Sequence, residues 1–269
     1  MSSSSAKSLA VAQLRRQLLQ SQPSATEHNV VSTGFRTLDR LLPQSGLPTG
    51  AVIEWVSGGA GMRATSIALK VIAGYLKRPG ALAVVDSTHS FCPAQLEQLG
   101  IPMSRLLLIR PGDSSSSSPD NVSGSFSDTN YQLSSTQRSE ALWSLEQLAR
   151  CAGVNVVLTW IDRLSSTAQR RLQLAVEKSG TTVILMRPSI AMNQTSWADL
   201  RFHVQSGSAK PSADVSIVGH GSRMIVSLVR SRNSVQRHGN AVLECHHETG
   251  DVFEILELAS AAPADPTAV

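Results

Sequence analysis

A glycine-rich turn is the part of this sequence best suited to chemistry. It lies between an apolar run at 51–56 and an amphipathic segment at 65–75, which we expect to be a strand and a helix. Backbone N–H groups in such a turn, together with the start of the following helix, can bind phosphate groups. We therefore predict a nucleotide or anion site whose contacts come from Gly58, Gly59, Gly61, Arg63 and Thr65.

The same turn lacks residues that an ATPase needs. The phosphate-binding motif reads G-x-x-x-x-G-K-[ST], and counted from Gly58 it has Arg63 for the second glycine and Ala64 for the lysine. Only Thr65 fits, and it also suits a helix start. Because no lysine reaches the reacting phosphoryl group, we expect no catalytic residues and no required cofactor, while residual ATP binding stays open. Arg63 either contacts a bound anion or is solvated.

Apolar runs alternate with amphipathic segments along the middle of the chain. Continuous apolar runs indicate strands buried on both faces, at 51–56, 81–86, 106–110, 154–160 and 182–186. Helical patterns separate them, at 65–75, 93–99, 139–151 and 167–178. This alternation predicts an α/β fold, in which a mostly parallel, doubly wound sheet has helices on both faces.

The rest of the chain sets the domain boundaries. Period-two stretches at 197–204, 224–230 and 241–245 predict antiparallel strands added to one edge of the sheet. We expect an N-terminal helix and linker at 1–29, a core at 30–258, a disordered serine-rich insertion at 111–137 and a disordered tail at 259–269.

The composition excludes several classes of protein. The three cysteines, Cys92, Cys151 and Cys245, form no C-x-x-C pair, so we expect neither a disulfide framework nor a zinc site. The run Cys-His-His-Glu at 245–248 would alternate between strand faces and predicts no metal site. The lack of an apolar signal core or membrane-spanning run predicts a cytoplasmic protein with no membrane partner. A net charge of +4 permits nucleic-acid contact without requiring it.

The order of the motifs resembles the RecA-type recombinase core. Thr33-Gly34, Gly46-Leu47-Pro48 and Asp86-x-x-His89 carry this resemblance, which spans residues 31–252. A closer resemblance is to the ImuA family, the RecA-like accessory proteins of bacterial damage-induced mutagenesis. It rests on short motifs along the chain: Glu54-Trp55, Ala141-Leu142-Trp143, Arg170 to Ala175, Arg187-Pro188 and Ser196-Trp197-Ala198-Asp199. The resemblance implies a RecA-like P-loop fold.

This resemblance also implies where a RecA-type ATPase would keep its catalytic groups. Thr88 holds the position of the glutamate that orients water, and Trp160 holds the position of the Walker B aspartate. Asp162 follows two residues later, which is a displacement of about 6 to 7 Å in an extended chain. These replacements predict a protein that does not hydrolyse ATP and binds no metal at this place.

Two groups of arginines follow from the same resemblance. RecA-type cores contact DNA through the loops after the fourth and fifth strands, which gives Arg163, Arg170, Arg171 and Arg187 as candidate contacts. Such cores also bring basic residues across a subunit interface, and the matching positions are Arg230 and Arg232, for which a solvated edge strand is the alternative. Because neither DNA loop contains an aromatic residue, we expect weak, salt-sensitive binding of single-stranded DNA at most.

The expected function is that of a hydrolysis-deficient accessory protein in the DNA damage (SOS) response. By resemblance it supports error-prone translesion synthesis with an inactive Y-family polymerase homologue, an error-prone C-family polymerase and the sliding clamp, with RecA and single-stranded DNA as further candidate partners at the nucleoid. Two alternatives remain. One is an active RecA-family DNA-dependent ATPase in recombination, and the other is a DNA-independent regulator, such as a division inhibitor or a recombinase antagonist. Monomer, ring and filament are equally open.

Overall fold

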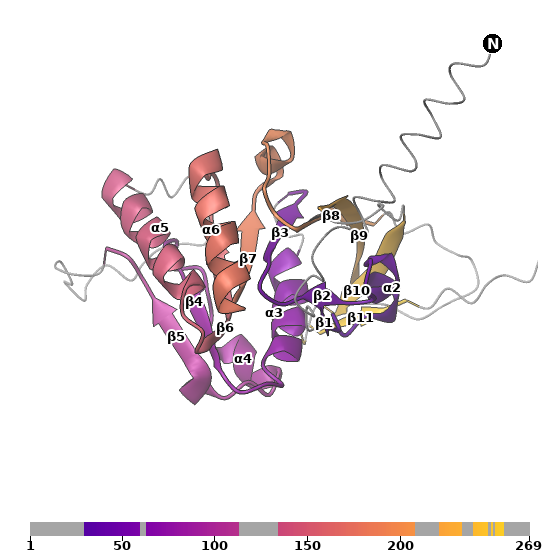
Figure 1. Ribbon diagram of the computed structural model, residues 1–269. Helices are drawn as coiled ribbons and strands as arrows, with labels where there is room; N and C mark the ends of the chain where they lie inside the picture. The colour runs from indigo at the N-terminus through magenta and orange to yellow at the C-terminus, as the bar shows by residue number, and fades with distance from the viewer. Residues whose placement is uncertain are drawn as a thin grey trace, which may run out of the picture.

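The computed structural model describes residues 30–59, 63–112, 134–207, 221–232, 239–246, 249 and 251–255. They form a nine-stranded sheet with helices on both faces and a small antiparallel sheet of β1 (Val30–Val31) and β2 (Leu47–Pro48) (Figure 1). The predicted helix and linker at 1–29, the tail at 259–269 and most of the serine-rich insertion lie outside the described residues.

The large sheet is parallel over most of its width. Its strands are β3 (Val52–Ser57), β4 (Ala81–Val85), β5 (Leu106–Ile109), β6 (Val154–Trp160), β7 (Thr182–Arg187), β8 (Leu200–Ser206), β9 (Gly221–Ser231), β10 (Asn240–His246) and β11 (Val252–Glu254). Their order is β11-β10-β9-β8-β3-β7-β6-β4-β5. Neighbours from β8 to β5 pair in parallel, whereas β9, β10 and β11 pair antiparallel. The predicted α/β fold with a mostly parallel sheet and antiparallel edge strands is confirmed.

One predicted strand direction is wrong. The stretch 197–204 was expected to be an antiparallel edge strand, but β8 begins at Leu200 and pairs in parallel with β3. The chain crosses from β7 over β3 through a short 3-10 helix, η2 (Ser189–Asn193), and residues 194–199. Parallel neighbours need a crossover of about a dozen residues, usually with an α-helix. This crossover has no α-helix, so the sequence pattern did not reveal it.

The helices form two layers that cover opposite faces of the sheet. The helices α2 (Arg36–Leu41), α3 (Ala64–Tyr75) and α4 (Ala94–Gln98) contribute to one apolar core, and α5 (Ser135–Ala149) and α6 (Ser166–Ser179) contribute to the other (Figure 1). In the first core Trp55 of β3 stacks on Phe202 of β8, with ring centroids 4.5 Å apart. None of the helices in the described part of the chain is long and apolar enough to cross a bilayer.

Helix α5 begins inside the segment that was expected to be disordered. Ser134 accepts a hydrogen bond from the backbone N–H of Gln137, and the Gln137 side chain accepts one from the backbone N–H of Ser134. This capping box fixes the first turn of the helix, so the predicted insertion at 111–137 extends too far at its carboxyl end. Residues 113–133 lie outside the described residues.

Candidate functional site

The glycine-rich turn starts as a continuation of the sheet. The backbone N–H of Gly58 donates to the carbonyl of Val204 in β8 (2.7 Å), and Ser57 Oγ donates to the carbonyl of Gly59 (2.6 Å). A Cβ atom at Gly58 would lie only 2.9 Å from the Val204 oxygen, so glycine is required there. Gly58 and Gly59 therefore lie at the carboxyl end of β3, as predicted, while Gly61 is outside the described residues.

Arg63 occupies the left-handed backbone region at the start of α3, with φ of 46°. This conformation favours glycine, which is the residue that the phosphate-binding motif places there. Its side chain reaches Cys245 in β10. Burial raises the pKa of the Cys245 thiol, while the charge of the Arg63 guanidinium and its hydrogen bond to the thiol lower it. The Arg63 guanidinium therefore lies near β10, and its contact with a bound anion stays a prediction.

The first residues of α3 keep the backbone of an anion site without its charge. Ala64 is buried, with 4% of its surface exposed, and Thr65 follows it in the first turn. Arg63 occupies the N-cap position of α3, and no side chain makes a capping hydrogen bond there. Thr65 therefore does not cap the helix. The backbone N–H groups at the helix start can still attract an anion. They cannot supply the cation that the missing lysine would provide.

The carboxylate at the end of β4 organises its own loop. Asp86 is fully buried, and its two oxygens accept hydrogen bonds from the backbone N–H groups of Ser90 (3.0 Å) and Phe91 (3.2 Å). The Arg110 guanidinium lies 3.4 Å from one of these oxygens. Thr88, at the position of the catalytic glutamate, has its hydroxyl 2.8 Å from Ser90 Oγ. The Thr88 hydroxyl cannot act as a general base.

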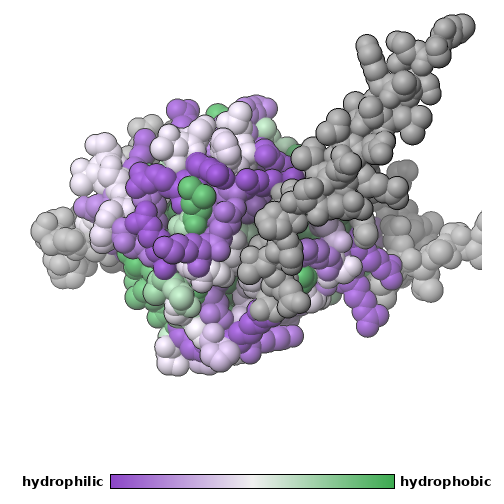
Figure 2. Space-filling model, viewed as in Figure 1, coloured by the Kyte–Doolittle hydropathy of each residue, from purple (hydrophilic) through white to green (hydrophobic). Residues whose placement is uncertain are grey.

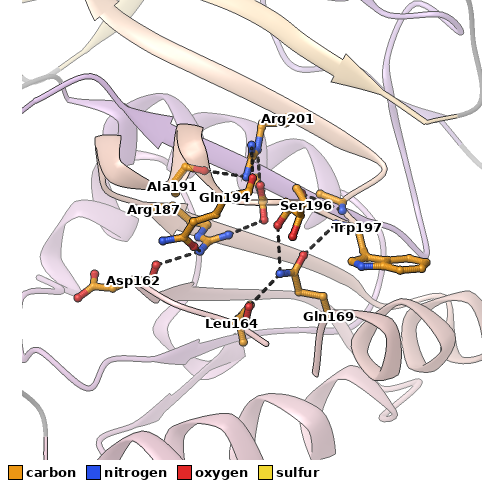
Figure 3. A network of polar contacts seen from close by, with 12 residues as sticks. Asp162, Leu164, Gln169, Arg187, Ala191, Gln194, Ser196, Trp197 and Arg201 are labelled. Carbon is orange, nitrogen blue, oxygen red and sulfur yellow. Dashed lines mark hydrogen bonds and ion pairs between the residues drawn. The ribbon is translucent and has the colours of Figure 1, made fainter. Parts of the chain in front are cut away.

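The end of β6 is apolar where a metal-binding aspartate would be needed. Trp160 packs against Phe91, with ring centroids 6.0 Å apart, and joins the edge of the larger core. Asp162 is exposed, and Figure 3 shows its carboxylate pointing away from the polar network that its carbonyl joins. Among the described residues there is no cluster of histidine, cysteine and acidic side chains that could hold a metal ion.

A buried ion triad connects three neighbouring strands beside the turn. Glu54 of β3 is fully buried and receives hydrogen bonds from Arg187 Nη1 (2.9 Å) and Arg201 Nε (2.6 Å). The side chains of Arg187 and Arg201 are 0% and 7% exposed. One carboxylate thus balances two guanidinium groups, and the triad carries a net positive charge away from water. Such a charge is stable only when further polar groups surround it.

The loops after β6 and β7 supply those polar groups. Arg187 Nη2 donates to the Asp162 carbonyl (2.9 Å) and to Gln194 Oε1 (2.6 Å). Arg201 donates to the carbonyls of Gln194 (3.2 Å) and Ala191 (3.1 Å). Figure 3 shows these groups converging on the two arginines from the loop. The triad therefore holds the loop against the sheet by its backbone.

A second amide extends this network to the start of α6. Gln169 Nε2 donates to the Leu164 carbonyl (3.0 Å), and its oxygen accepts from the backbone N–H of Trp197 (2.8 Å). The loop after β6 and the loop after β7 are thus joined through one buried side chain (Figure 3). Both loops have a defined position relative to the sheet without any ligand.

Comparison with known proteins identifies the architecture. The family of the RecA N-terminal domain matches residues 15–193, which is more than half of the chain. The chain belongs to the RecA family. It is 31% identical to Protein RecA of Mesomycoplasma hyopneumoniae (strain 7448) over 157 residues, which are 58% of this chain and 46% of that protein.

Other relatives match over shorter stretches. Protein RecA of Chlorobium limicola is 41% identical over 81 residues, 30% of this chain and 23% of that protein. Protein RecA of Gluconobacter oxydans is 36% identical over 90 residues, 34% of this chain and 26% of that protein. The chain therefore matches less than half the length of each of these RecA proteins.

The four arginines predicted to contact DNA have different surroundings in this RecA-like core. Arg163 and Arg170 are exposed, and Arg170 lies over the ring of Trp197, 5.7 Å from its centroid. Arg171 is 55% exposed but forms an ion pair with Glu146 of α5. The prediction that Arg187 contacts DNA is wrong, because its side chain is buried in the triad and bonds the loop after β7 instead. Arg163 and Arg170 remain the accessible candidates.

The two arginines predicted at a subunit interface bond within the chain. Arg230 donates to the carbonyl of Ser196, and Arg232 Nη1 lies 3.7 Å from Asp199 and 3.8 Å from Glu177. Both residues are exposed. Contacts within the chain thus already engage both guanidinium groups. Pairing across a subunit boundary stays a prediction.

Sequence reasoning missed several residues of this region. Trp197 lies outside both predicted DNA loops, yet it is 40% exposed beside Arg170 and places an aromatic side chain next to them. Glu54 and Arg201 were not expected to pair, although a lone acid in an apolar strand signals a buried partner. His203 lies beside the turn, since a Cβ on Gly58 would be 3.4 Å from its Nε2, and desolvation lowers its pKa.

Proposed function

We propose that this RecA-family protein is an accessory factor that assembles partners in the DNA damage response and does not hydrolyse ATP. The observation that carries the proposal is the side chain at the end of β6. Trp160 packs on Phe91 where a RecA-type ATPase would present a carboxylate to magnesium. A large aromatic ring at this position provides no oxygen ligand for the metal.

Two further features of the site support the loss of hydrolysis. Ala64 offers no charge to the phosphates, and the Arg63 guanidinium, the nearest cation in sequence, is engaged at Cys245. Thr88 replaces the group that would orient water, and the neighbouring Asp86 is occupied by two backbone N–H groups and Arg110. Restoring one residue would therefore not restore catalysis, because lysine, glutamate and aspartate functions are absent together.

Weak DNA binding is part of the proposal. Arg163 and Arg170 are exposed on adjoining segments, and Trp197 offers an aromatic ring on which a base can stack. The ion triad already orders the loop that leads to Trp197, so binding needs no nucleotide to shape it. We expect contacts to phosphates without sequence preference, with an affinity that falls steeply as salt rises.

The partners are proposed from the resemblance to the ImuA family. They are an inactive Y-family polymerase homologue and an error-prone C-family polymerase in translesion synthesis, with RecA as a further candidate. The test is analytical ultracentrifugation of the purified chain mixed with the purified Y-family homologue, with and without magnesium and ATP. We expect a complex of defined stoichiometry whose affinity does not change with ATP. A complex that forms only with ATP would contradict the proposal and favour an ATP-gated role.

A further inference from the structure

A basic groove lies at the end of the molecule opposite to the glycine-rich turn. It has a volume of about 490 Å³ and is formed where α5 and α6 end, around Arg150, Arg171, Leu174 and Lys178. Because β6 begins at Val154, soon after α5 ends, the groove lies at the amino ends of the parallel strands. The glycine-rich turn follows the carboxyl end of β3, so the groove is a separate surface.

Positive charge predominates in the groove. Arg150 and Lys178 are exposed, and none of the described residues that line the groove is acidic. Glu146 lies below the surface with 4% exposure and offsets one charge by pairing with Arg171. The carbonyl end of a helix carries about half a negative charge, so the ends of α5 and α6 offset about one further cation. Of the two remaining cations, Arg150 and Lys178, about one charge is left, and it keeps the groove positive.

The groove also has an apolar side. Leu174 is 50% exposed on α6, next to Ala175, which forms part of the same wall. Figure 2 shows a small apolar patch over α6 that is enclosed by hydrophilic side chains. An apolar centre with a charged rim is the usual layout of a surface that binds another protein. The positive rim then favours a partner segment of negative charge.

We propose that this groove binds an acidic segment of a partner protein, with an apolar side chain of that segment packed on Leu174 and its carboxylates beside Arg150 and Lys178. The basic segment at residues 7–21 of a second copy is a poor occupant, since it carries Lys7, Arg15 and Arg16 and no acidic residue. A nucleic-acid backbone would match the charge but would leave Leu174 uncovered. The inference goes beyond the proposed function and does not depend on the loss of ATP hydrolysis.

Fluorescence anisotropy at low salt tests the groove with a defined probe. The probe is a fluorescein-labelled, glutamate-rich peptide with two leucines one helical turn apart, and oligo(dT) is the competing class of ligand. We expect the peptide to bind the full chain. The double variant Arg150→Glu/Lys178→Glu should weaken binding by about tenfold or more, because two attractions become two repulsions. Leu174→Ala should weaken it about threefold through lost apolar contact.

The matched control is Arg36→Glu/Arg138→Glu, which changes the net charge equally at exposed positions away from the groove. We expect it to change peptide affinity by less than about twofold, since distant exposed charges are screened. All variants should stay folded at the assay temperature, because the substituted side chains are exposed or half-exposed. The groove variant should unfold a few degrees below the unmodified chain, since its two acidic side chains face the carbonyl ends of α5 and α6.

Several outcomes would overturn the inference. One is an absence of peptide binding by the unmodified chain. Another is an equal loss in both double variants, which would show attraction to net charge alone. The third is binding of oligo(dT), and not of the peptide, that depends on Arg150 and Lys178.

Discussion

Removing the charge of Glu54 is the sharpest perturbation of this fold. Glu54→Gln keeps the shape of the side chain but leaves Arg187 and Arg201 facing each other with no carboxylate between them. The two guanidinium groups are 0% and 7% exposed, so water cannot replace the lost charge without opening the loop between β7 and β8. We expect the folded state to lose stability and this loop to become mobile.

The magnitude follows from the two hydrogen bonds that Glu54 accepts, at 2.9 and 2.6 Å. Removing one partner of a buried ion pair costs about 3–5 kcal/mol, because the remaining charge stays buried and uncompensated. Here two charges remain, which favours the upper part of that range. If the slope of unfolding free energy against urea is about 2–3 kcal/mol per molar, the midpoint falls by about 1.3 to 2.5 M.

Equilibrium unfolding in urea, followed by tryptophan fluorescence and circular dichroism, measures this loss. The control is Glu140→Gln on α5, which removes the same charge from an exposed position. We expect the control to change the free energy of unfolding by less than about 0.5 kcal/mol. Hydrogen exchange would locate the effect, with faster exchange expected at residues 189–197 in the Glu54 variant only.

A loss of less than about 1 kcal/mol for Glu54→Gln would refute this reasoning, because it would mean that the triad is not desolvated. The ranking of variants is a second test. Arg187→Met should cost less than Glu54→Gln, since it leaves the neutral pair of Glu54 and Arg201 in place. The reverse ranking would show that hydrogen bonds to the loop, and not charge balance, dominate.

Three further predictions concern other parts of the molecule. Ser134→Ala should cost about 1 kcal/mol of unfolding free energy in thermal or urea unfolding, because it removes the capping box of α5, and an unchanged stability would contradict the helix start at Ser135. The pKa of His203 is lowered from 6.5, so the unfolded chain takes up the proton first and stability is lost as pH falls below about 6.5; His203→Gln should flatten this slope, measured by the melting temperature against pH. In the native protein a thiol reagent should modify the exposed Cys92 and Cys151 rapidly and the buried Cys245 only on unfolding, and rapid modification of all three thiols would contradict the packing of β10.

The parallel part of the fold could be predicted because its signal is local. The apolar runs that became β3, β4, β6 and β7 are buried on both faces, and helical segments separate them in the sequence. The run that became β5 was expected to be buried in the same way, but β5 lies at the edge of the sheet and Leu107 is 45% exposed. The direction of β8 depends on a crossover that has no α-helix, so no local pattern reveals it. The start of α5 depends on a two-residue cap within a serine-rich stretch, which composition alone classifies as disordered.

The sequence predicts which residue types the site contains better than it predicts where their side chains lie. The absence of a lysine at position 64 could be predicted, because the phosphate-binding motif fixes the spacing of its residues. Arg187 was predicted to be a free cation, since its partner Glu54 lies 133 residues away in sequence. Trp197 and Arg170 meet where Gln169 joins the start of α6 to the loop after β7. Contacts of this kind depend on tertiary structure, and a single sequence does not encode them in a local pattern.

The most direct test of the central claim is phosphate release by the purified chain with magnesium, ATP and single-stranded DNA. We predict no release above that of a blank without protein, because the side chains at positions 64, 88 and 160 cannot supply the lysine, the base or the metal ligand. Sustained, DNA-stimulated release that Thr65→Ala or Asp162→Ala abolishes would contradict the claim. It would show that this RecA-family site hydrolyses ATP with a different set of residues.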